Sequence, residues 1–194
     1  MKIILASNNA HKAREIEQLL PQGVQIVTLR EVGFNKPIIE DATTFEGNAL
    51  IKARTVFAEY HQPCLADDSG LEVNCLNGAP GVYSARYSGE GATDETNNIK
   101  LLENIKDKAD LSACFRTVLA FIDADGKEHL FEGKVNGNLT LSPRGSEGFG
   151  YDPLFCPVEF PDKTFAELSL AEKNKISHRA RALMAMNAWM KTES

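Results

Sequence analysis

Hydrophobic residues follow two different patterns at the beginning of the chain. Residues 2–6 form a short apolar run that is typical of a strand, and residues 24–28 form a second one. Between these runs Ala13, Ile16 and Leu20 recur at helical spacing, and the asparagines just before them can cap the helix. The chain is therefore expected to open with a β-α-β unit whose strands are parallel and whose crossover is right-handed.

The middle of the chain predicts two helices separated by two short strands. Thr43 and Glu46 have the spacing of a capping box, which predicts a helix running to about Tyr60. Beyond it, aspartate, serine and glycine residues interrupt an apolar run, and this polar break predicts two strands rather than one. The two strands are expected at residues 64–66 and 71–76, with the break at residues 67–70 between them. The next helix is expected at residues 93–105.

The second half of the chain predicts a β-hairpin followed by helices. Asn136-Gly137 is expected to turn the chain after the hairpin. Ser169 and Glu172 form another capping box, and Ser177 can cap a last helix. The hairpin strands are expected at residues 112–123 and 127–135, joined by a turn at residues 124–126.

The composition is that of an ordinary globular protein, with 43% hydrophobic and 25% charged residues. The net charge of -6 argues against nucleic-acid binding, which needs a basic surface. A small anionic substrate can still bind, because a metal ion and a few local cations outweigh the net charge. Since no linker or repeat divides the chain, residues 1–194 are expected to form one α/β domain with a mixed sheet.

The cysteines and the apolar runs bear on where the protein works. The four cysteines are scattered, with no C-x-x-C pair and no zinc-site spacing, so free thiols in a reducing cytoplasm are the simplest interpretation. No apolar run approaches the roughly 18–20 residues of a membrane span, and the first run is too short for a signal peptide. We therefore expect a cytoplasmic protein that binds neither membranes nor nucleic acid.

Two adjacent carboxylates, Asp67 and Asp68, follow a short apolar run and precede a serine and a glycine. Carboxylates at the carboxyl end of a strand suit a hard cation such as Mg²⁺, in the place where α/β folds bind ligands. The same residue types are also the commonest in turns, and on these four residues alone a turn is favoured. A third carboxylate could come from Glu40 or Asp41, just ahead of the long helix.

Two helical segments carry residues that can bind phosphate. In the first, a helix N-terminus and a lysine follow the opening strand, which is a common arrangement for anion binding. In the second, Asn48 and Lys52 lie one helical turn apart. Each segment by itself is also explained by a capped helix with a solvated lysine. The first segment consists of Ser7, Asn8, Asn9, Ala10, His11 and Lys12.

A glycine-rich stretch at residues 145–153 carries two aromatic residues and an acid. It can stack an aromatic ring on a planar base, or it can be a tight turn that Phe149 or Tyr151 merely anchors. Lys173 and residues 177–179 lie around the start of the last helix, where cations and an imidazole can bind an anion or a carbonyl oxygen. Together with the carboxylates and the other lysines, these residues suit a metal–triphosphate nucleotide.

In these motifs the chain resembles the inosine triphosphate pyrophosphatase family, whose members hydrolyse non-standard purine nucleoside triphosphates such as dITP, ITP and XTP. The resemblance runs from Lys2 to Trp189, and its motifs occur in the family's order, which makes it far more specific than any single motif. The motifs are Ser7-Asn8-Asn9-x-x-Lys12-x-x-Glu15, Phe45-x-x-Asn48-Ala49-x-x-Lys52-Ala53, Asp67 to Leu71 with Gly78 to Tyr87, Gly148 to Pro153, and Ser177-His178-Arg179.

The resemblance implies a two-lobed α/β fold with a long mixed β-sheet flanked by helices, a central active-site cleft between the lobes, and a homodimer. It implies Mg²⁺-dependent cleavage between the α- and β-phosphates, which releases a nucleoside monophosphate and pyrophosphate and cleanses the nucleotide pool. It also implies that Asp68 is the catalytic proton acceptor and a metal ligand, with Glu40 and Asp67 supporting the metal. The implied substrate-binding residues are, for phosphate or sugar, Ser7, Asn8, Asn9, Ala10, His11, Lys12, Asn48, Lys52, Ser69 and Lys173, and, for the base, Phe149, Gly150, Tyr151, Asp152, His178 and Arg179.

This implied base site makes a prediction about selectivity. The guanidinium of Arg179 has only donors, so it can pair with the 6-oxo group of hypoxanthine or xanthine but not with the 6-amino group of adenine. We therefore expect ITP, dITP and XTP to be good substrates and ATP a very poor one. Guanine shares the 6-oxo group, so GTP is expected to be a poor substrate because of its 2-amino group instead.

Two other interpretations stay open from the sequence. One is a pyrophosphatase of the same general shape that acts on other nucleotides, such as modified pyrimidine triphosphates. The other is a nucleotide-binding regulatory module without turnover. The carboxylates argue against the second, because a protein that only binds nucleotide needs no water-activating base.

Overall fold

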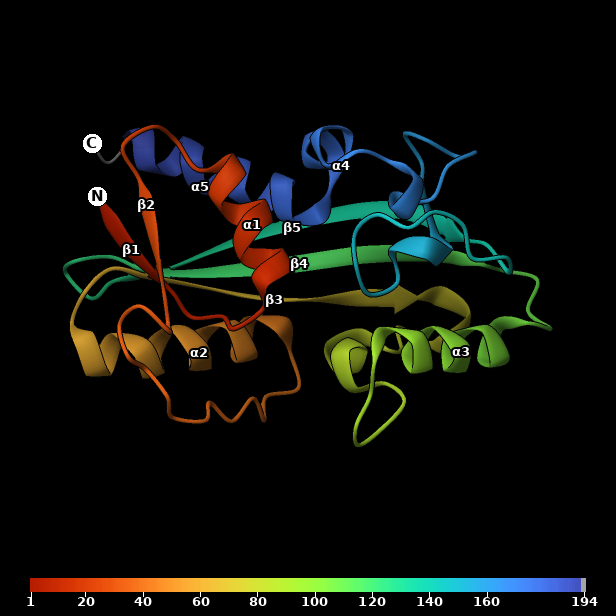
Figure 1. The fold of residues 1–194 in the computed structure, drawn as a ribbon, viewed down its shortest axis with the longest axis horizontal. Helices are drawn as coiled ribbons and strands as arrows, with labels where there is room; N and C mark the ends of the chain where they lie inside the picture. Colours follow the sequence, from red (N-terminus) through yellow and green to blue (C-terminus); the bar gives the residue numbers. More distant parts are fainter. Residues whose placement is uncertain (193–194) are drawn as a thin grey trace. The chain divides into compact units, whose positions relative to one another are not determined.

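The computed structural model describes residues 1–192 and divides into two compact units (Figure 1). Unit 1 comprises Met1–Asp68, Thr117–Gly133 and the chain from Arg179 onward, and unit 2 comprises Ser69–Arg116 and Lys134–His178. Within the described residues, a six-stranded sheet with the strand order β2-β1-β3-β4-β5-β6 contributes to both units. The mixed parallel and antiparallel pairing confirms the predicted α/β fold class.

Unit 1 opens with the predicted β-α-β unit. Strands β1 (Lys2–Leu5) and β2 (Gln25–Thr28) pair in parallel, and helix α1 (Ala10–Leu19) connects them. The side chain of Asn9 caps α1 by accepting hydrogen bonds from the backbone N–H groups of His11 and Lys12. The local cap and the apolar spacing were therefore sufficient to predict this unit.

Helix α2 (Phe45–Tyr60) ends where the sequence predicted but begins one residue later than the predicted box. The cap is Thr44, whose Oγ1 accepts a hydrogen bond of 3.1 Å from the N–H of Gly47. The prediction of a capping box from Thr43 and Glu46 was therefore wrong by one residue. Adjacent threonines offer the same capping oxygen, and the buried Phe45 takes the first helical position.

Strand β3 (Cys64–Val73) is continuous, so the predicted break at residues 67–70 was wrong. The residue types there favour a turn when they are exposed. Both Asp67 and Asp68 are instead buried in the strand, where cationic side chains from other elements satisfy them. Tertiary contacts thus override the local preference for a turn.

The predicted hairpin is formed by β4 (Ser112–Ile122) and β5 (Glu128–Leu139). The turn predicted at Asn136-Gly137 is absent, because β5 continues and pairs antiparallel with β6 (Phe155–Pro157). A Cβ atom on Gly137 would lie 2.3 Å from the carbonyl oxygen of Cys156. This glycine therefore allows two strands to approach closely and does not turn the chain.

Helices cover the strands within each unit. In Figure 1, α2 and α5 (His178–Thr192) lie on opposite sides of the strands of unit 1, and in unit 2 α3 (Asp94–Ile105) and α4 (Leu170–Ile176) do the same. The capping box predicted at Ser169 for α4 is confirmed, and the structure adds a cap at Thr93 for α3. No helix within residues 1–192 is long and apolar enough to cross a membrane. Short 3₁₀ helices occur at Asn74–Leu76, Gly81–Arg86, Asp152–Leu154 and Phe165–Glu167.

Each unit has its own apolar core. In unit 1 the fully buried Ile3, Ile16 and Leu183 bring β1, α1 and α5 together. In unit 2 the fully buried Leu101 and Phe155 belong to a cluster that joins α3 to the strands. The polar residues considered below are attached to these two rigid frames.

Candidate active site

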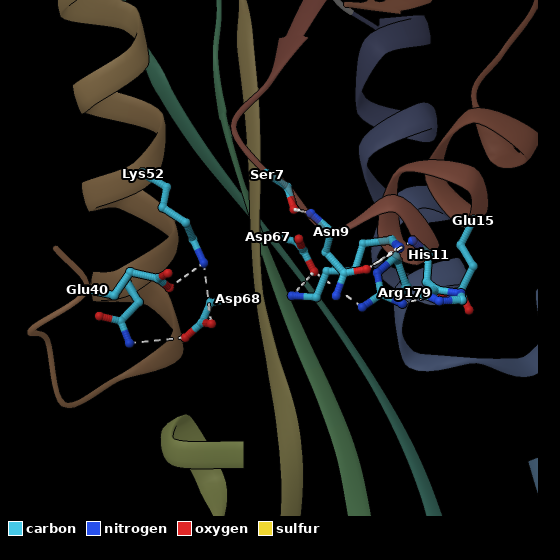
Figure 2. A network of polar contacts seen from close by, with 11 residues as sticks. Ser7, Asn9, His11, Glu15, Glu40, Lys52, Asp67, Asp68 and Arg179 are labelled. Carbon is cyan, nitrogen blue, oxygen red and sulfur yellow. Dashed lines mark hydrogen bonds and ion pairs between the residues drawn. The ribbon is translucent and has the colours of Figure 1, made fainter. Parts of the chain in front are cut away.

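The adjacent carboxylates of β3 point to opposite faces of the strand. Successive residues of a β-strand alternate between its two faces. Figure 2 shows Asp67 directed toward α1 and Arg179, and Asp68 directed toward Lys52 on α2. The sequence identified the two neighbouring carboxylates but could not separate their surroundings.

One face carries the Asp68 cluster, which consists of Glu40, Asn48, Lys52 and Asp68 (Figure 2). The Nδ2 of Asn48 donates to Oδ2 of Asp68 at 3.2 Å, and the ammonium of Lys52 lies 3.5 Å from its Oδ1. The same ammonium donates to Oε2 of Glu40 at 2.5 Å. The predicted one-turn spacing of Asn48 and Lys52 on α2 thus brings both residues to Asp68, and Glu40, rather than the exposed Asp41, is the acid that joins them.

Burial shapes the charges of this cluster. Burial raises the pKa of Asp68, and the positive charges of Lys52 and Lys12 offset it only in part. Burial alone would lower the pKa of Lys52, but the carboxylates of Asp68, Asp67 and Glu40 outweigh it and raise that pKa. Asp68 is therefore a stronger base than an ordinary aspartate, while Lys52 stays positively charged beside it.

The other face carries the Asp67 cluster, which consists of Lys12, Glu15, Asp67 and Arg179 (Figure 2). Lys12 lies 3.0 Å from Oδ2 of Asp67, and the Nη2 of Arg179 donates to the same oxygen at 3.3 Å. The Nη1 of Arg179 donates to Oε2 of Glu15. Arg179 and Asp67 are almost fully buried, so this is an internal ion-pair network rather than a surface one.

The network also sets the protonation of its members. Burial by itself would raise the pKa of Asp67, but the charges of Lys12, Arg179 and Lys52 outweigh it and hold that pKa well below its usual range. Burial lowers the pKa of Lys12. The carboxylate of Asp67 opposes this only in part, and the positive charges of Arg179 and Lys52 lower that pKa further. Asp67 is thus a fixed negative charge, in contrast to the more basic Asp68 on the other face.

Glu15 is a member of the Asp67 cluster to which sequence reasoning assigned no role. It was part of a matching motif but received no role, because an acid on a helix normally faces solvent. Its side chain is instead buried against the guanidinium of Arg179, a residue 164 positions away in the chain. Its spacing of three residues from Lys12 on α1 was the one available signal, since residues that far apart share a helix face.

The predicted phosphate segment lies at the start of α1. Ser7 Oγ accepts a hydrogen bond of 3.2 Å from the N–H of Asn9, and Asn9 in turn caps the helix. Asn8, Asn9, Ala10 and His11 are exposed, whereas Lys12 turns inward to Asp67. The segment therefore presents an exposed helix N-terminus, capped by Asn9, beside a lysine that is already bound to Asp67.

The glycine-rich stretch of unit 2 is held together by Asp152. Its Oδ2 accepts from the N–H of Phe149 at 2.9 Å and from the ammonium of Lys173 at 2.7 Å. A Cβ on Gly148, whose φ is +76°, would lie 2.1 Å from that oxygen. Lys173 also lies 5.0 Å from the ring centroid of Phe149, close enough for a cation–π contact.

The two aromatic residues of this stretch have different surroundings. Tyr151 is buried, its hydroxyl donates to the carbonyl of Ser84 at 2.8 Å, and burial raises its pKa. Phe149 is only half-buried. Tyr151 is therefore the anchor of the loop, and Phe149 is the ring that can stack on a base.

The predicted base contacts at residues 178 and 179 also differ from each other. The imidazole of His178 stacks on Phe115 with a ring-centroid distance of 4.8 Å and an interplanar angle of 9°. Phe115 stacks in turn on Phe165, at 5.8 Å. Arg179 instead contributes its guanidinium to Glu15 and Asp67, so these neighbours in sequence have separate sets of partners.

The motifs that suggested a family in the sequence can be compared directly with known proteins. Residues 3–189 of the chain match the model of the Ham1 family. The chain belongs to the Ham1 family. It is 49% identical over 190 residues to the dITP/XTP pyrophosphatase of Porphyromonas gingivalis, with 97% of each chain covered. It is 46% identical over 186 residues to the dITP/XTP pyrophosphatase of Flavobacterium psychrophilum, with 96% of this chain and 97% of that one covered.

Solved Ham1 structures agree with the fold. The Staphylococcus aureus Ham1 protein superposes with a TM-score of 0.90 at 37% identity, and coverage is 100% of both chains. The HAM1 protein from Coxiella burnetii gives a TM-score of 0.90 at 39% identity and the same coverage. These comparisons confirm the family resemblance and the mixed sheet flanked by helices.

In this Ham1 chain, Glu40 and Asp68 are the residues that fit a magnesium ion. Their carboxylates supply the hard oxygen donors that Mg²⁺ prefers, and both already bind one cation, the ammonium of Lys52. No group of three or more His, Cys, Asp or Glu that could hold a metal occurs among the residues described. Mg²⁺ is commonly held by one or two carboxylates together with substrate phosphates. Asp67, predicted as a third supporting acid, lies with Lys12 and Arg179 on the other face of β3.

Proposed function

We propose that this Ham1 chain hydrolyses the non-standard purine nucleoside triphosphates dITP, ITP and XTP to the nucleoside monophosphate and pyrophosphate. The observation that carries the proposal is the environment of Asp68. It is a buried carboxylate of raised pKa, held by Asn48 and Lys52, in a chain whose relatives are named dITP/XTP pyrophosphatases. Removal of these nucleotides would keep their bases out of DNA and RNA.

The chain's own residues divide the chemistry between them. Asp68 accepts a proton from the attacking water, whose oxygen forms the new bond to phosphorus as the bond between the α- and β-phosphates breaks. Asn48 holds the Asp68 carboxylate in place, because its other amide atom, Oδ1, accepts a hydrogen bond of 3.0 Å from the N–H of Ala42. Lys12 and Lys52 neutralise the charge that develops on the departing pyrophosphate.

We further propose that the activity depends on Mg²⁺ held by Glu40 and Asp68. A bound Mg²⁺ supplies charge neutralisation for the phosphate oxygens and orients the water. Treatment with a chelator is expected to abolish pyrophosphate release, and added Mg²⁺ is expected to restore it. Activity that is unchanged by exhaustive chelation would contradict the proposal.

The remaining assignments concern the phosphates, the sugar and the base. We propose that residues 7–12, Lys52, Ser69 and Lys173 contact phosphate or sugar, and that Phe149 to Asp152 with His178 and Arg179 form the surroundings of the base. Residues 1–194 would then act as one pyrophosphatase domain. Two observations support a single domain. Each of β3, β4 and β5 contributes residues to both units, and the family match covers residues 3–189.

Phosphate binding by the lysines can be tested by substitution. Lys12→Ala and Lys52→Ala are expected to weaken ITP binding by roughly 1.5–3 kcal/mol each, the scale of a hydrogen bond to a charged group, and to change IMP binding much less. Lys173→Ala is expected to weaken ITP and IMP alike, because Lys173 also binds Asp152 in the base loop. Equal losses for ITP and IMP in the Lys12 and Lys52 variants would show that they do not bind the phosphate chain.

The proposed function itself is tested by comparing substrates. We expect kcat/KM for ITP to exceed that for ATP by about 10⁴, because a site that pairs a 6-oxo group leaves polar groups unpaired when adenine binds. Pyrophosphate release is measured for ITP, XTP, ATP, GTP and a modified pyrimidine triphosphate. Comparable values for ITP and ATP would refute the proposal, a preference for the pyrimidine would favour the related enzyme class, and absence of turnover would favour a regulatory module.

The cellular setting is proposed in the same way. We propose a homodimer on the basis of the family resemblance. We propose a cytoplasmic location because Cys64, Cys75, Cys114 and Cys156 are all free thiols, as expected in a reducing compartment.

A further inference from the structure

Helix α3 binds both backbone polar groups of Gly150, the residue that follows the half-buried Phe149. The N–H of Gly150 donates to Oδ2 of Asp94 at 2.7 Å, and the Nδ2 of Asn98 donates to the carbonyl of Gly150 at 2.9 Å. Asp94 and Asn98 are four residues apart, so they lie on the same face of α3. We call this pair of residues the Gly150 clamp.

The helix that carries the clamp is itself firmly held within unit 2. Thr93 caps its N-terminus, and Leu101 and Ile105 are fully buried in the apolar core. Asn97 accepts a hydrogen bond of 2.7 Å from the N–H of Ser88, and its amide donates to the carbonyl of Ala85 at 3.1 Å. The clamp therefore connects the loop to a rigid element and not to another loop.

The clamp acts at a loop residue that has no side chain of its own to hold it. Gly150 has a φ of +62°, a left-handed conformation that glycine adopts without cost, and a Cβ added there would meet nothing within 4 Å. The space beside its Cα is therefore open, and no side-chain packing there restrains the residue. On either side, Phe149 is bound to Asp152 and Tyr151 to Ser84, so the two clamp bonds fix the backbone between them.

We propose that Asp94 and Asn98 are positioning residues for the purine base, because they hold the Gly150 backbone that sets the direction of the Phe149 ring. The inference rests on the proposed function, in which Phe149 stacks on the base. The clamp strengthens binding of the base by pre-organisation, because a loop already fixed in its bound conformation loses less entropy when the ligand binds. The clamp residues themselves do not touch the phosphates in this proposal.

The test measures binding of two product fragments by calorimetry, with IMP as the probe that has a base and inorganic pyrophosphate as the probe that lacks one. Asp94→Ala and Asn98→Ala are each expected to weaken IMP binding roughly three- to tenfold, the scale of one hydrogen bond, and to leave pyrophosphate binding unchanged. Asp94→Asn keeps an accepting oxygen and is expected to retain most of the IMP affinity.

Matched controls come from the same helix. Glu95→Ala removes the other acid of the first turn, and Asn104→Ala removes an asparagine that donates to the hydroxyl of Tyr87 at 2.7 Å. Both controls are expected to bind IMP like the unaltered protein. Thermal unfolding of every variant is followed in parallel, because a clamp variant must lose IMP affinity while the protein is fully folded.

The outcomes separate this inference from the proposed function. Selective loss of IMP affinity in the clamp variants, with rescue in Asp94→Asn, would support the clamp. The clamp would be overturned if its variants bound IMP with unchanged affinity, or lost affinity for IMP and pyrophosphate equally. It would also be overturned if the control variants lost as much IMP affinity, or if the unaltered protein did not bind IMP. Failure of the unaltered protein to release pyrophosphate from ITP would overturn the proposed function, whereas the calorimetric result would still decide the clamp.

Discussion

Asp68→Asn is expected to lower kcat for pyrophosphate release from ITP by about 10³-fold, within the usual contribution of a general base. Asparagine has nearly the same shape, and its oxygen can still accept the hydrogen bond from Asn48. It cannot accept the proton of the attacking water, and it removes one of the two carboxylates beside Lys52. The loss is therefore expected in kcat rather than in folding.

The measurement is steady-state release of pyrophosphate, combined with circular dichroism and thermal unfolding. Asp125→Asn is the matched control, since Asp125 is an exposed aspartate in the β4–β5 turn. It is expected to retain full activity. An Asp68→Asn protein that is folded and keeps most of its activity would remove Asp68 from the mechanism.

Arg179→Met is expected to lower the thermal unfolding midpoint by about 10 °C. Methionine fills part of the volume but leaves the carboxylates of Glu15 and Asp67 without their shared guanidinium. Breaking a buried ion pair from one side typically costs about 3–5 kcal/mol, because the remaining charge stays buried without its partner. For a protein of this size, one kcal/mol corresponds to roughly 2–4 °C.

The chain offers a control with the same chemistry at the surface. Arg54 binds Glu128 through two hydrogen bonds, of 2.6 and 2.8 Å, and its side chain is 57% exposed. Arg54→Met is expected to cost less than about 1 kcal/mol, because water solvates both groups when the pair is broken. Similar midpoint shifts in the two variants would show that burial does not determine the strength of the Arg179 network.

The Arg179 variant also addresses the predicted selectivity. If Arg179 contacts the 6-oxo group of the base, its loss reduces kcat/KM for ITP more than for ATP. If it acts only through Asp67 and Glu15, both substrates are affected equally. The ratio of the two kcat/KM values at a temperature where the variant is folded therefore distinguishes the two roles.

The sequence by itself determined the features that depend on neighbouring residues. The cap at Asn9, the capping box of Ser169 and Glu172, and the hairpin turn between β4 and β5 involve hydrogen bonds and backbone preferences within a few positions. The spacing of Asn48 and Lys52, one helical turn apart on α2, is also a property of neighbouring residues. The order of the motifs was sufficient to indicate the family, because motif order is a property of the chain alone.

Only the tertiary structure decided how those parts are combined. Residues 67–70 favour a turn, yet they continue β3, because cations from α1, α2 and α5 satisfy the two aspartates. The same strand sends Asp67 to one face and Asp68 to the other, which gives one a lowered and the other a raised pKa. The spacing of Glu15 from Lys12 could not predict its pairing with Arg179, 164 residues away, because burial and long-range charge exist only after the chain has folded.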